Sequence, residues 1–410
     1  MESLISGALA RLVRVGTLKV TFASGRTRTF GDGREPIVAI RFADNGAERA
    51  LALDPALKLG ELFMDNRLIV ETGSIYDLIS LAKRSGLRRL RAPHIALIAL
   101  YRTLRSRIAA AVTPEGARRN VAHHYDLDAG LFELFLDTDR QYSCAYFEKP
   151  GQSLEDAQIA KKRHIAAKLL LEPGLKVLDI GSGWGGLALY LAQTASVRVT
   201  GITLSEKQLA IARRRAEELG LEGNVDFRLA DYRHIDETFD RIVSVGMFEH
   251  VGRRSYPAFF AKAASMLRRE NGVMLLHSIG RTRPALLNQP FVDKYIFPGG
   301  YIPALSEVLP AAERAGFLVK DLEILPMHYA WTLRAWRERF MANRDKAAAL
   351  YDERFCRMWE FYLATSEAAF RHDRLFVFQL QLARHQDAVP VRRDYMEKAE
   401  EVLRDGPAPA

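Results

Sequence analysis

The residues best suited to chemistry lie where strand-like runs end, and the clearest case is the glycine-rich segment VLDIGSGWGG at 177–186. A buried strand is expected to run into this turn, and the turn to open a helix. Glycines at such a corner let a ligand approach the backbone where a side chain would block it. Dinucleotide sites read G-x-G-x-x-G, whereas this turn reads G-S-G-W-G-G after Asp179. The segment predicts a ligand site that departs from the dinucleotide pattern. A strand–helix corner without a ligand is the alternative.

Two later strand ends point to the same edge of a sheet. One strand runs into TLSEKQ at 203–208, and the next ends in ADYR at 230–233. Ser205 with Gln208 also fits a capping box, which needs no ligand. Asp231 can accept a hydrogen bond from an adenine amino group, or it can cap a turn. Both segments therefore fit a nucleoside site and also a purely structural role.

Further polar residues stand inside apolar runs, and taken without other information each has a structural explanation. Glu249 follows a strand-like run in SVGMFEH, His277 stands within LLHSIG, and Cys144 within YSCAYF. Taken alone, each fits a structural role: a helix cap, a satisfied core histidine and an unreactive buried thiol. His250 adjoins Glu249, but neither HExxH nor another ligand spacing surrounds the pair. We therefore predict no metal site.

These residues need a scaffold, and the order of strand-like and helix-like runs predicts its class. Residues 119–403 alternate strands with helices, which indicates an α/β domain with a parallel sheet covered on both faces. FLVKDLEIL and LFVFQLQLAR are expected to be its last two strands, separated by a helical insert over 331–373. Residues 1–112 mix short strands, turns and helices, which predicts a smaller N-terminal α+β domain. Residues 113–118 are the expected linker.

Composition narrows the class of protein. With 48% apolar and 27% charged residues among 410, the chain is not of the disordered type. It has no run of about 20 nearly uncharged apolar residues, so no membrane-spanning helix is expected. Its start lacks a signal-peptide pattern, and two cysteines are too few for a disulfide framework. These features favour a reduced cytoplasmic protein.

The net charge of +9 favours an anionic partner. Residues 83–114 contribute strongly, because lysines and arginines there alternate with apolar stretches and no acidic residue occurs. Such a segment can lie on an anionic membrane surface, and a solvated helix face between domains is the alternative. The charge would permit nucleic acid, but no RNA-binding module is recognisable. We expect no nucleic-acid partner.

Seven segments occur in an order that resembles a known family. The D-x-G-x-G-x-G turn resembles that of S-adenosylmethionine-dependent methyltransferases. The whole series resembles the cyclopropane-fatty-acyl-phospholipid synthases, which include the mycolic acid cyclopropane synthases. The resemblance covers residues 119–400, and the first hundred residues resemble, less distinctively, the extra N-terminal domain of the bacterial phospholipid enzymes. Departures are small: Ser182 stands where many members have Cys, and Phe147 where some have Trp. The segments are YSCAYF (142–147), VLDIGSGWGG (177–186), GITLSEKQ (201–208), VGMFEHVG (245–252), LLHSIG (275–280), KYIFPGGYIP (294–303) and HYAWTLRAW (328–336).

The resemblance implies a Rossmann-like, seven-stranded class I methyltransferase domain that binds S-adenosylmethionine. It places Asp231 or Tyr232 near the adenine. The positions that we expect to contact the cofactor are Tyr142, Ser143, Asp179, Gly181, Gly183, Thr203, Leu204, Gln208, Asp231 and Tyr232.

The resemblance also implies transfer of a methylene group to the cis double bond of an unsaturated phospholipid acyl chain. The alkene attacks the sulfonium methyl, and a proton must then leave so that the ring closes, in a cleft that excludes water. A bound bicarbonate ion is the implied base. Its ligands map to Cys144, Glu249, His277, the backbone of Ile279, and Tyr329. Because Glu249 and an anion repel each other, the two need a shared proton.

Alternatives to ring formation stay open. One is a related fatty-acyl C-methyltransferase that makes a methyl- or methylene-branched chain, and a more distant one is an inactive lipid-binding protein. The KYIFPGG segment is expected to cover the acyl channel, with Tyr295, Ile296 and Phe297 either lining it or packing in a core. The implied partners are anionic membrane phospholipids, met by peripheral contact at the inner face of the membrane, and a second copy of the chain in a homodimer.

Overall fold

The computed structural model describes residues 1–85, 97–98, 101–102, 128–285 and 289–405. The expected linker at 113–118 and most of the basic segment at 83–114 lie outside these residues and stay predictions. No helix in the described ranges is long and apolar enough to cross a membrane.

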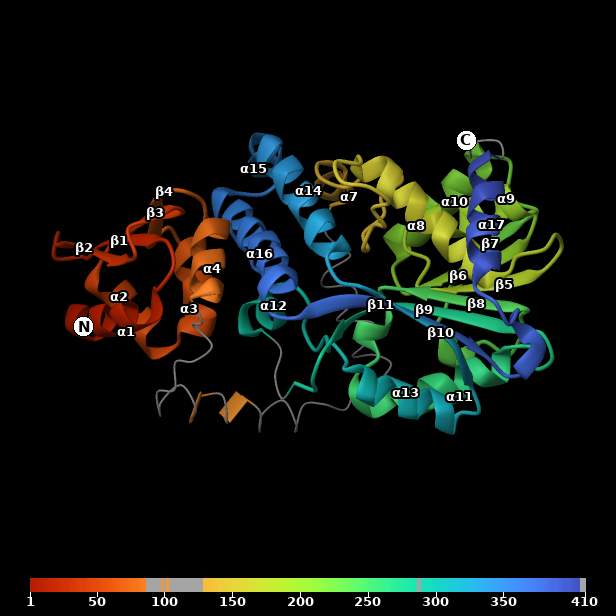
Figure 1. Cartoon of the computed structure of the whole chain (residues 1–410). Helices are drawn as coiled ribbons and strands as arrows, with labels where there is room; N and C mark the ends of the chain where they lie inside the picture. The colour runs from red at the N-terminus through yellow and green to blue at the C-terminus, as the bar shows by residue number, and fades with distance from the viewer. Residues whose placement is uncertain (86–96, 99–100, 103–127, 286–288, 406–410) are drawn as a thin grey trace. The chain divides into compact units, whose positions relative to one another are not determined.

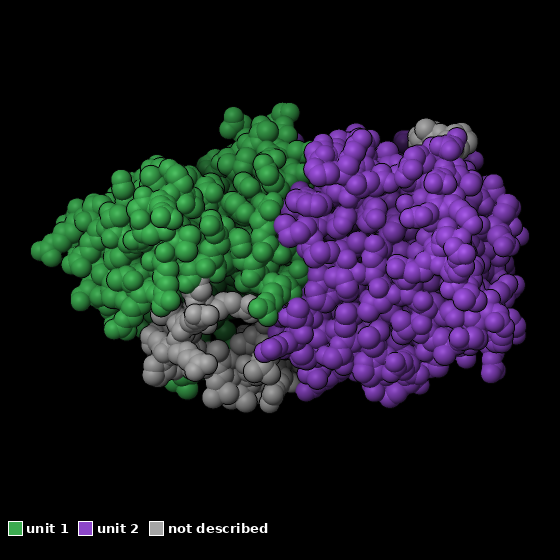
Figure 2. Space-filling view, in the orientation of Figure 1, with its two compact units in different colours: residues 1–110, 286–298, 333–375 green, residues 111–285, 299–332, 376–410 purple. Residues whose placement is uncertain are grey.

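Close packing divides the chain into two compact units, which Figure 2 colours separately. Unit 1 consists of residues 1–110, 286–298 and 333–375, and unit 2 of residues 111–285, 299–332 and 376–410. Two of these segments differ from the predicted domain bounds, because 286–298 and 333–375 pack with the N-terminal residues.

Apolar burial explains this grouping. Phe291 and Phe361, one from each segment, belong to the same hydrophobic core as the N-terminal strands and helices. A Cβ atom at Gly60 would lie 2.3 Å from the ring of Phe291. The N-terminal residues therefore accommodate that ring only with glycine at this position.

Unit 1 has the predicted α+β character. Its four-stranded sheet has the order β2-β1-β3-β4, in which β1 pairs antiparallel with β2 and parallel with β3. Along β3 the buried side chains are Val38, Ile40 and Phe42, the period of two that a strand requires to bury one face. The elements of this unit are α1 (Glu2–Leu12), β1 (Thr17–Thr21), β2 (Thr27–Gly31), β3 (Ile37–Phe42), α2 (Asn45–Leu53), α3 (Pro55–Met64), β4 (Leu68–Thr72), α4 (Ile75–Arg84), α12 (Pro290–Tyr295), α15 (Arg344–Leu350) and α16 (Glu353–His372), and α14 (His328–Ala342) begins in unit 2 and ends in unit 1.

The start of the KYIFPGG segment packs within unit 1. Tyr295 donates its hydroxyl hydrogen bond to Glu61 Oε1 at 2.9 Å, and its ring lies 4.9 Å from that of Phe291. Ile296 is 1% exposed. These two side chains therefore have the core role that the sequence left open as an alternative.

Unit 2 contains the seven-stranded sheet. Its strand order is β10-β11-β9-β8-β5-β6-β7, with β5, β6, β7, β8 and β9 paired in parallel and β10 antiparallel to β11. The predicted α/β class is thus confirmed, as are the last two strands on either side of a helical insert. The elements are α7 (Ala129–Glu133), α8 (Leu154–Leu169), β5 (Lys176–Ile180), α9 (Gly186–Ala195), β6 (Arg198–Thr203), α10 (Glu206–Glu218), β7 (Val225–Leu229), η2 (Tyr232–His234), β8 (Arg241–Val245), η3 (Phe248–His250), η4 (Arg253–Ser255), α11 (Tyr256–Met266), β9 (Val273–Arg281), α13 (Leu305–Arg314), β10 (Leu318–Leu325), β11 (Leu375–Ala383), η5 (Gln386–Ala388) and α17 (Asp394–Asp405).

Helices cover both faces of this sheet (Figure 1). Along β5, Leu178 and Ile180 belong to the core that α11 and α13 form on one face. Val177 belongs instead to the core formed with α8, α9 and α10 on the other. A strand buried on both faces reads as a continuous apolar run, which is why β5 was recognisable in the sequence. The carboxyl ends of β5, β6, β7 and β8 are left free to build a site.

Candidate functional site

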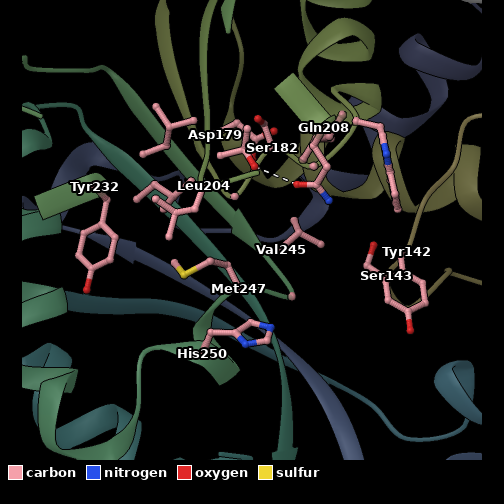
Figure 3. Close-up of a pocket in the computed structure, with 18 of the residues that line it drawn as sticks. Tyr142, Ser143, Asp179, Ser182, Leu204, Gln208, Tyr232, Val245, Met247 and His250 are labelled. Atoms are coloured by element: carbon pink, nitrogen blue, oxygen red, sulfur yellow. Dashed lines mark hydrogen bonds between the residues drawn. The ribbon is translucent and has the colours of Figure 1, made fainter. Parts of the chain in front are cut away.

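A pocket opens at the carboxyl ends of the parallel strands, where open α/β sheets bind ligands. It encloses about 1290 Å³, part of which is open to solvent, and side chains from several loops surround it in Figure 3. All ten residues that the sequence nominated for cofactor contact line this pocket. The remaining lining residues are Arg140, Gln141, Ile180, Ser182, Trp184, Leu187, Ile202, Ala230, Arg233, Val245, Gly246, Met247, His250, Val251 and Ser255.

The glycine-rich turn after β5 forms one wall. Gly181 has φ +88°, and a Cβ there would lie 2.9 Å from Met247, so the close approach of the two loops requires glycine. Gly183 has φ +56°, and a Cβ there would meet no atom within 4 Å. Because Gly183 lines the pocket, that empty space belongs to the pocket itself. A side chain at this position would occupy room that a ligand needs.

The end of β6 forms the neighbouring wall. Ser205 caps α10 by accepting from Gln208 N at 3.3 Å, as one half of a capping box requires. The side chain of Gln208 does not return to the cap. Its Oε1 accepts from Thr203 Oγ1 at 2.9 Å, the hydrogen bond drawn in Figure 3. The segment thus combines a structural cap with two polar side chains on the pocket wall.

Asp231 also has both roles that the sequence allowed. Its Oδ1 accepts from Arg233 N at 3.0 Å and so caps η2, while the same carboxylate pairs with the Arg233 guanidinium. Burial raises the pKa of Asp231, but hydrogen bonds from Arg233 outweigh it and lower the pKa below its ordinary value. Asp231 is therefore a charged acceptor on the pocket wall, beside Tyr232.

Asp179 and Lys161 set the electrostatics beneath the pocket. Asp179 Oδ2 is buried without a hydrogen-bond partner in the part of the chain that the structure describes. Burial raises the pKa of Asp179 to about 7, against an opposing effect of Lys161. Lys161 is 1% exposed, and its Nζ donates to Gln141 Oε1 at 2.5 Å and to Ser143 Oγ at 2.8 Å. Burial lowers the pKa of Lys161 to about 8.

The residues nominated as catalytic do not line this pocket but lie among the elements beside it. Two of them are in direct contact, because Ile279 N donates to Glu249 Oε1 at 2.6 Å. Glu249 Oε2 is buried and, within the described residues, has no hydrogen-bond partner. Burial raises the pKa of Glu249, although the bond from Ile279 acts in the opposite direction. This carboxyl is thus predisposed to hold a proton.

His277 lies on β9 and pairs with Val245, the last residue of β8, directly before the loop that lines the pocket. Its carbonyl accepts from Gly246 N at 3.0 Å, and Gly246 lines the pocket. The ring Nδ1 lies 3.2 Å from Gln379 Nε2. Burial lowers the pKa of His277 well below its ordinary value, and the nearby lysines Lys161 and Lys168 act in the same direction. The imidazole is therefore neutral near pH 7.

Cys144 and Tyr329 come from two further segments. The residue after Cys144, Ala145, donates its N–H to Thr332 Oγ1 at 3.0 Å, which joins this loop to the first turn of α14, where Tyr329 lies. Burial raises the pKa of Cys144 above its ordinary value, and the thiol lies 3.3 Å from the Ala145 carbonyl. Cys144 is therefore a neutral thiol, the inert state that the sequence alone favoured.

Two polar residues of the site were not expected from the sequence. Lys161 lies in the run KKRH of α8, and such a charge run usually marks a solvated face; here it is buried. His250 was considered only as a metal ligand, but it lines the pocket, and burial lowers its pKa to about 4. Its position directly after Glu249, in the η3 turn that follows β8, was the available signal. In the described ranges no group of three or more His, Cys, Asp or Glu side chains is arranged to hold a metal ion.

The sheet order, the glycine turn after its central strand and the polar strand ends define a class I S-adenosylmethionine-dependent methyltransferase fold. The sequence model described as "Mycolic acid cyclopropane synthetase" matches residues 113–380, and a domain family of unknown function matches residues 6–91. The chain belongs to the mycolic acid cyclopropane synthetase family, a family of S-adenosylmethionine-dependent methyltransferases.

The chain is similar to curated proteins that are named either as cyclopropane synthases or as fatty acid methyltransferases. The chain is 44% identical over 261 residues to a cyclopropane-fatty-acyl-phospholipid synthase of Escherichia coli, which is 64% of this chain and 66% of that protein. It is 40% identical to a probable fatty acid methyltransferase of Pseudomonas putida, over 63% of this chain and 68% of that one. It is 41% identical to a tuberculostearic acid methyltransferase of Mycobacterium tuberculosis, over 65% of each chain.

Two solved structures that resemble this chain are also cyclopropane synthases. A cyclopropane synthase from Mycobacterium tuberculosis is 35% identical, with a TM-score of 0.63 over 67% of this chain and 99% of that one. A mycolic acid cyclopropane synthase in complex with S-adenosylhomocysteine (SAH) and CTAB is 36% identical, with a TM-score of 0.62 over 65% of this chain and 97% of that one.

Proposed function

We propose that the chain is a cyclopropane-fatty-acyl-phospholipid synthase, which transfers a methylene group from S-adenosylmethionine to the cis double bond of an unsaturated phospholipid acyl chain. One observation carries the proposal. A buried carboxyl whose pKa is raised by burial, Glu249, has one oxygen fixed by Ile279 N–H and the other without a partner in the described structure, beside a methyltransferase-type pocket. Ring closure must pass one proton to a base, and a buried carboxyl that retains its own proton can donate a hydrogen bond to an anionic base held beside it.

The pocket fits S-adenosylmethionine. Two of its buried polar atoms, Asp179 Oδ2 and Ser182 Oγ, have no partner in the described residues, so both await a ligand that supplies hydrogen bonds. The open space beside Gly183 accommodates such a ligand. When bound, S-adenosylmethionine supplies an electrophilic methyl group. Thr203, Gln208 and Asp231 orient the ligand through their polar atoms, and the glycine turn leaves room for it.

The chain's own residues then protect and complete the reaction. The π electrons of the alkene would take the methyl group as its bond to sulfur breaks and SAH is left, and the positive charge that would then develop on the acyl chain must not meet water. Glu249 is 9% exposed, and Phe248 and Val251, close to it in the sequence, are 0% and 6% exposed, so this segment is largely shielded from solvent. One proton must leave the added carbon so that the ring closes, and it leaves toward a base held beside Glu249.

The residues also fit a bicarbonate ion as that base. A protonated Glu249 donates through its unpartnered oxygen instead of repelling the anion, and neutral His277 supplies an N–H donor. We propose that both hold the ion together with Cys144, Tyr329 and the backbone at Ile279. Bicarbonate would supply a proton acceptor in a place where a charged carboxylate is costly. The N–H of Ile279 already donates to Glu249. The backbone atom of Ile279 that is left for a hydrogen bond with the ion is therefore its carbonyl oxygen, which can accept from the hydroxyl of bicarbonate.

A branched-chain product is the second candidate. Relatives named as fatty acid or tuberculostearic acid methyltransferases are 40% and 41% identical, close to the 44% of the cyclopropane synthase. The cyclopropane and the branched chain form through the same cationic intermediate, and they differ in what happens to one proton. We propose ring closure, in which the proton leaves the added carbon toward a base held beside Glu249.

We further propose where the enzyme acts. The net charge of +9 attracts the chain to anionic phospholipid, which supports peripheral contact with the inner face of the membrane from the cytoplasm. From the family resemblance we also propose a homodimer. Sedimentation velocity tests this proposal, because it distinguishes the mass of one chain from that of two.

Methyl transfer to lipid is the direct test of this function. The pure protein is incubated with methyl-labelled S-adenosylmethionine and vesicles of cis-monounsaturated phospholipid, and label is counted in the extracted lipid. Vesicles of saturated phospholipid are the matched control. Label in the unsaturated lipid alone supports the proposal, whereas label in both or in neither contradicts it.

A further inference from the structure

A buried chain of hydrogen bonds runs from the surface of unit 2 to His277. His164 of α8 lies between two carboxylates, with Nδ1 2.5 Å from Glu400 Oε1 and Nε2 2.6 Å from Glu323 Oε2. Glu323 pairs in turn with Lys168. Lys168 Nζ donates to Gln379 Oε1 at 2.8 Å, and Gln379 Nε2 lies 3.2 Å from His277 Nδ1.

The charge of each titratable residue in this hydrogen-bond network depends on its neighbours. Burial alone would raise the pKa of Glu323, but hydrogen bonds from His164 and the charge of Lys168 lower it to about 2. Burial would lower the pKa of His164, yet its bonds to Glu323 and Glu400 raise it above the ordinary value. Glu323 is thus a carboxylate near pH 7. Lys168 forms an ion pair with this carboxylate; burial lowers the pKa of Lys168, and the charge of Glu323 and its hydrogen bond act in the opposite direction.

The ammonium of Lys168 decides how the Gln379 amide is oriented. An ammonium group can only donate, so the atom of Gln379 that faces it must be the carbonyl oxygen. The opposite side of the amide, its NH₂ group, then faces His277. An NH₂ group also can only donate, and Nδ1 of His277 must therefore accept. A neutral imidazole carries a single proton, which is left on Nε2.

We propose that Gln379, oriented by Lys168, is a positioning residue that holds His277 in the tautomer with its proton on Nε2. The inference rests on the proposed function for its meaning, because an Nε2–H donor can bind an anionic base, whereas the other tautomer would present a lone pair to it. Neither Gln379 nor Lys168 was nominated from the sequence. Both are buried, at 0% and 1% exposure, so the orientation is set inside the protein and not by solvent.

The test combines a tautomer measurement with kinetics. Proton–nitrogen NMR of the full-length protein, labelled with ¹⁵N-histidine, reports which ring nitrogen is protonated, and His277→Asn assigns the signal. Gln379→Glu keeps the shape but replaces the NH₂ donor by an oxygen acceptor, which recruits a proton to Nδ1. We expect the wild type to show Nε2–H, and the variant to show Nδ1–H with a turnover lower by about 100-fold and an SAH affinity within about twofold.

A second variant and a matched control cover the case in which Gln379→Glu fails to fold. Gln379→Met removes the donor without adding charge, and should lower turnover by about 10-fold or more while SAH still binds. Gln381 lies two residues along the same strand and is equally buried, but its Nε2 donates to the Lys168 carbonyl and to Tyr395 Oη. Gln381→Met should leave the tautomer unchanged and turnover within about threefold.

The outcomes separate this inference from the proposed function. A wild-type His277 protonated on Nδ1, or a Gln379→Glu variant that keeps Nε2–H, overturns the inference even if lipid product forms. Unchanged turnover in Gln379→Met also overturns it. An Nε2–H tautomer that Gln379→Glu reverses, in a protein that modifies no lipid, supports the positioning role and refutes the proposed function alone.

Discussion

Asp179 should control cofactor affinity near neutral pH. Its carboxyl is 2% exposed, and burial raises its pKa to about 7, with Lys161 opposing the shift. Oδ2 has no hydrogen-bond partner within the described chain. SAH carries an ammonium group and ribose hydroxyls, which bind an ionised carboxylate better than a protonated one. Binding is therefore expected to strengthen as the pH rises through 7 and to weaken as it falls.

The size of the effect follows from that pKa. For one carboxyl with a pKa of about 7 that must ionise on binding, the apparent dissociation constant rises about eightfold from pH 7.5 to pH 6.0, or about 1.2 kcal/mol. His250 does not titrate in this window, because burial lowers its pKa to about 4. Lys161 stays mainly protonated, since its pKa is about 8.

Isothermal titration calorimetry with SAH measures this dependence. The matched variant is Asp179→Asn, which keeps the shape but cannot ionise. Its affinity should be nearly constant over the same pH range and lower than that of the wild type by about tenfold or more at pH 7.5. A wild-type affinity that is constant with pH, or an Asn variant with the same eightfold change, would refute the reasoning.

Three other predictions concern the base, the glycine turn and the membrane. Glu249→Gln keeps the acceptor for Ile279 N but replaces the acidic O–H that shares a proton with the base by a weaker amide donor, so turnover should fall by about 100-fold or more with SAH affinity within about twofold; lost SAH binding would show that Glu249 belongs to the cofactor site. Gly183→Val should abolish SAH binding, whereas Gly174→Val, which shares a positive φ and open surroundings but does not line the pocket, should not; equal losses would mean that backbone strain is the cause. Sedimentation with anionic vesicles should recover several-fold less protein when ionic strength rises from about 0.05 M to about 0.5 M, because salt screens the attraction; recovery that does not change with salt would remove the electrostatic account.

The sequence predicted the sheet and the pocket wall for a common physical reason. Parallel strands covered on both faces read as apolar runs, and the residues that follow them meet at one edge. Asp179, Thr203 and Asp231 could therefore be nominated from three separate segments, and all three line one pocket.

The buried polar network could not be predicted in the same way. Lys161 and Lys168 belong to a helix whose charged side chains resemble a solvated face in the sequence, and their burial depends on contacts with distant residues such as Glu323. The grouping of unit 1 has a similar origin. Gly60 gives no local sign that it must leave room for Phe291, more than two hundred positions away.

Proton NMR of the acyl product tests the central claim most directly. The protein, S-adenosylmethionine and anionic vesicles of cis-monounsaturated phospholipid are mixed with bicarbonate present and with bicarbonate rigorously excluded. Ring closure predicts strongly upfield cyclopropane methylene signals that weaken when bicarbonate is removed. A branched methyl or exocyclic methylene signal, or ring formation that does not depend on bicarbonate, would contradict the account.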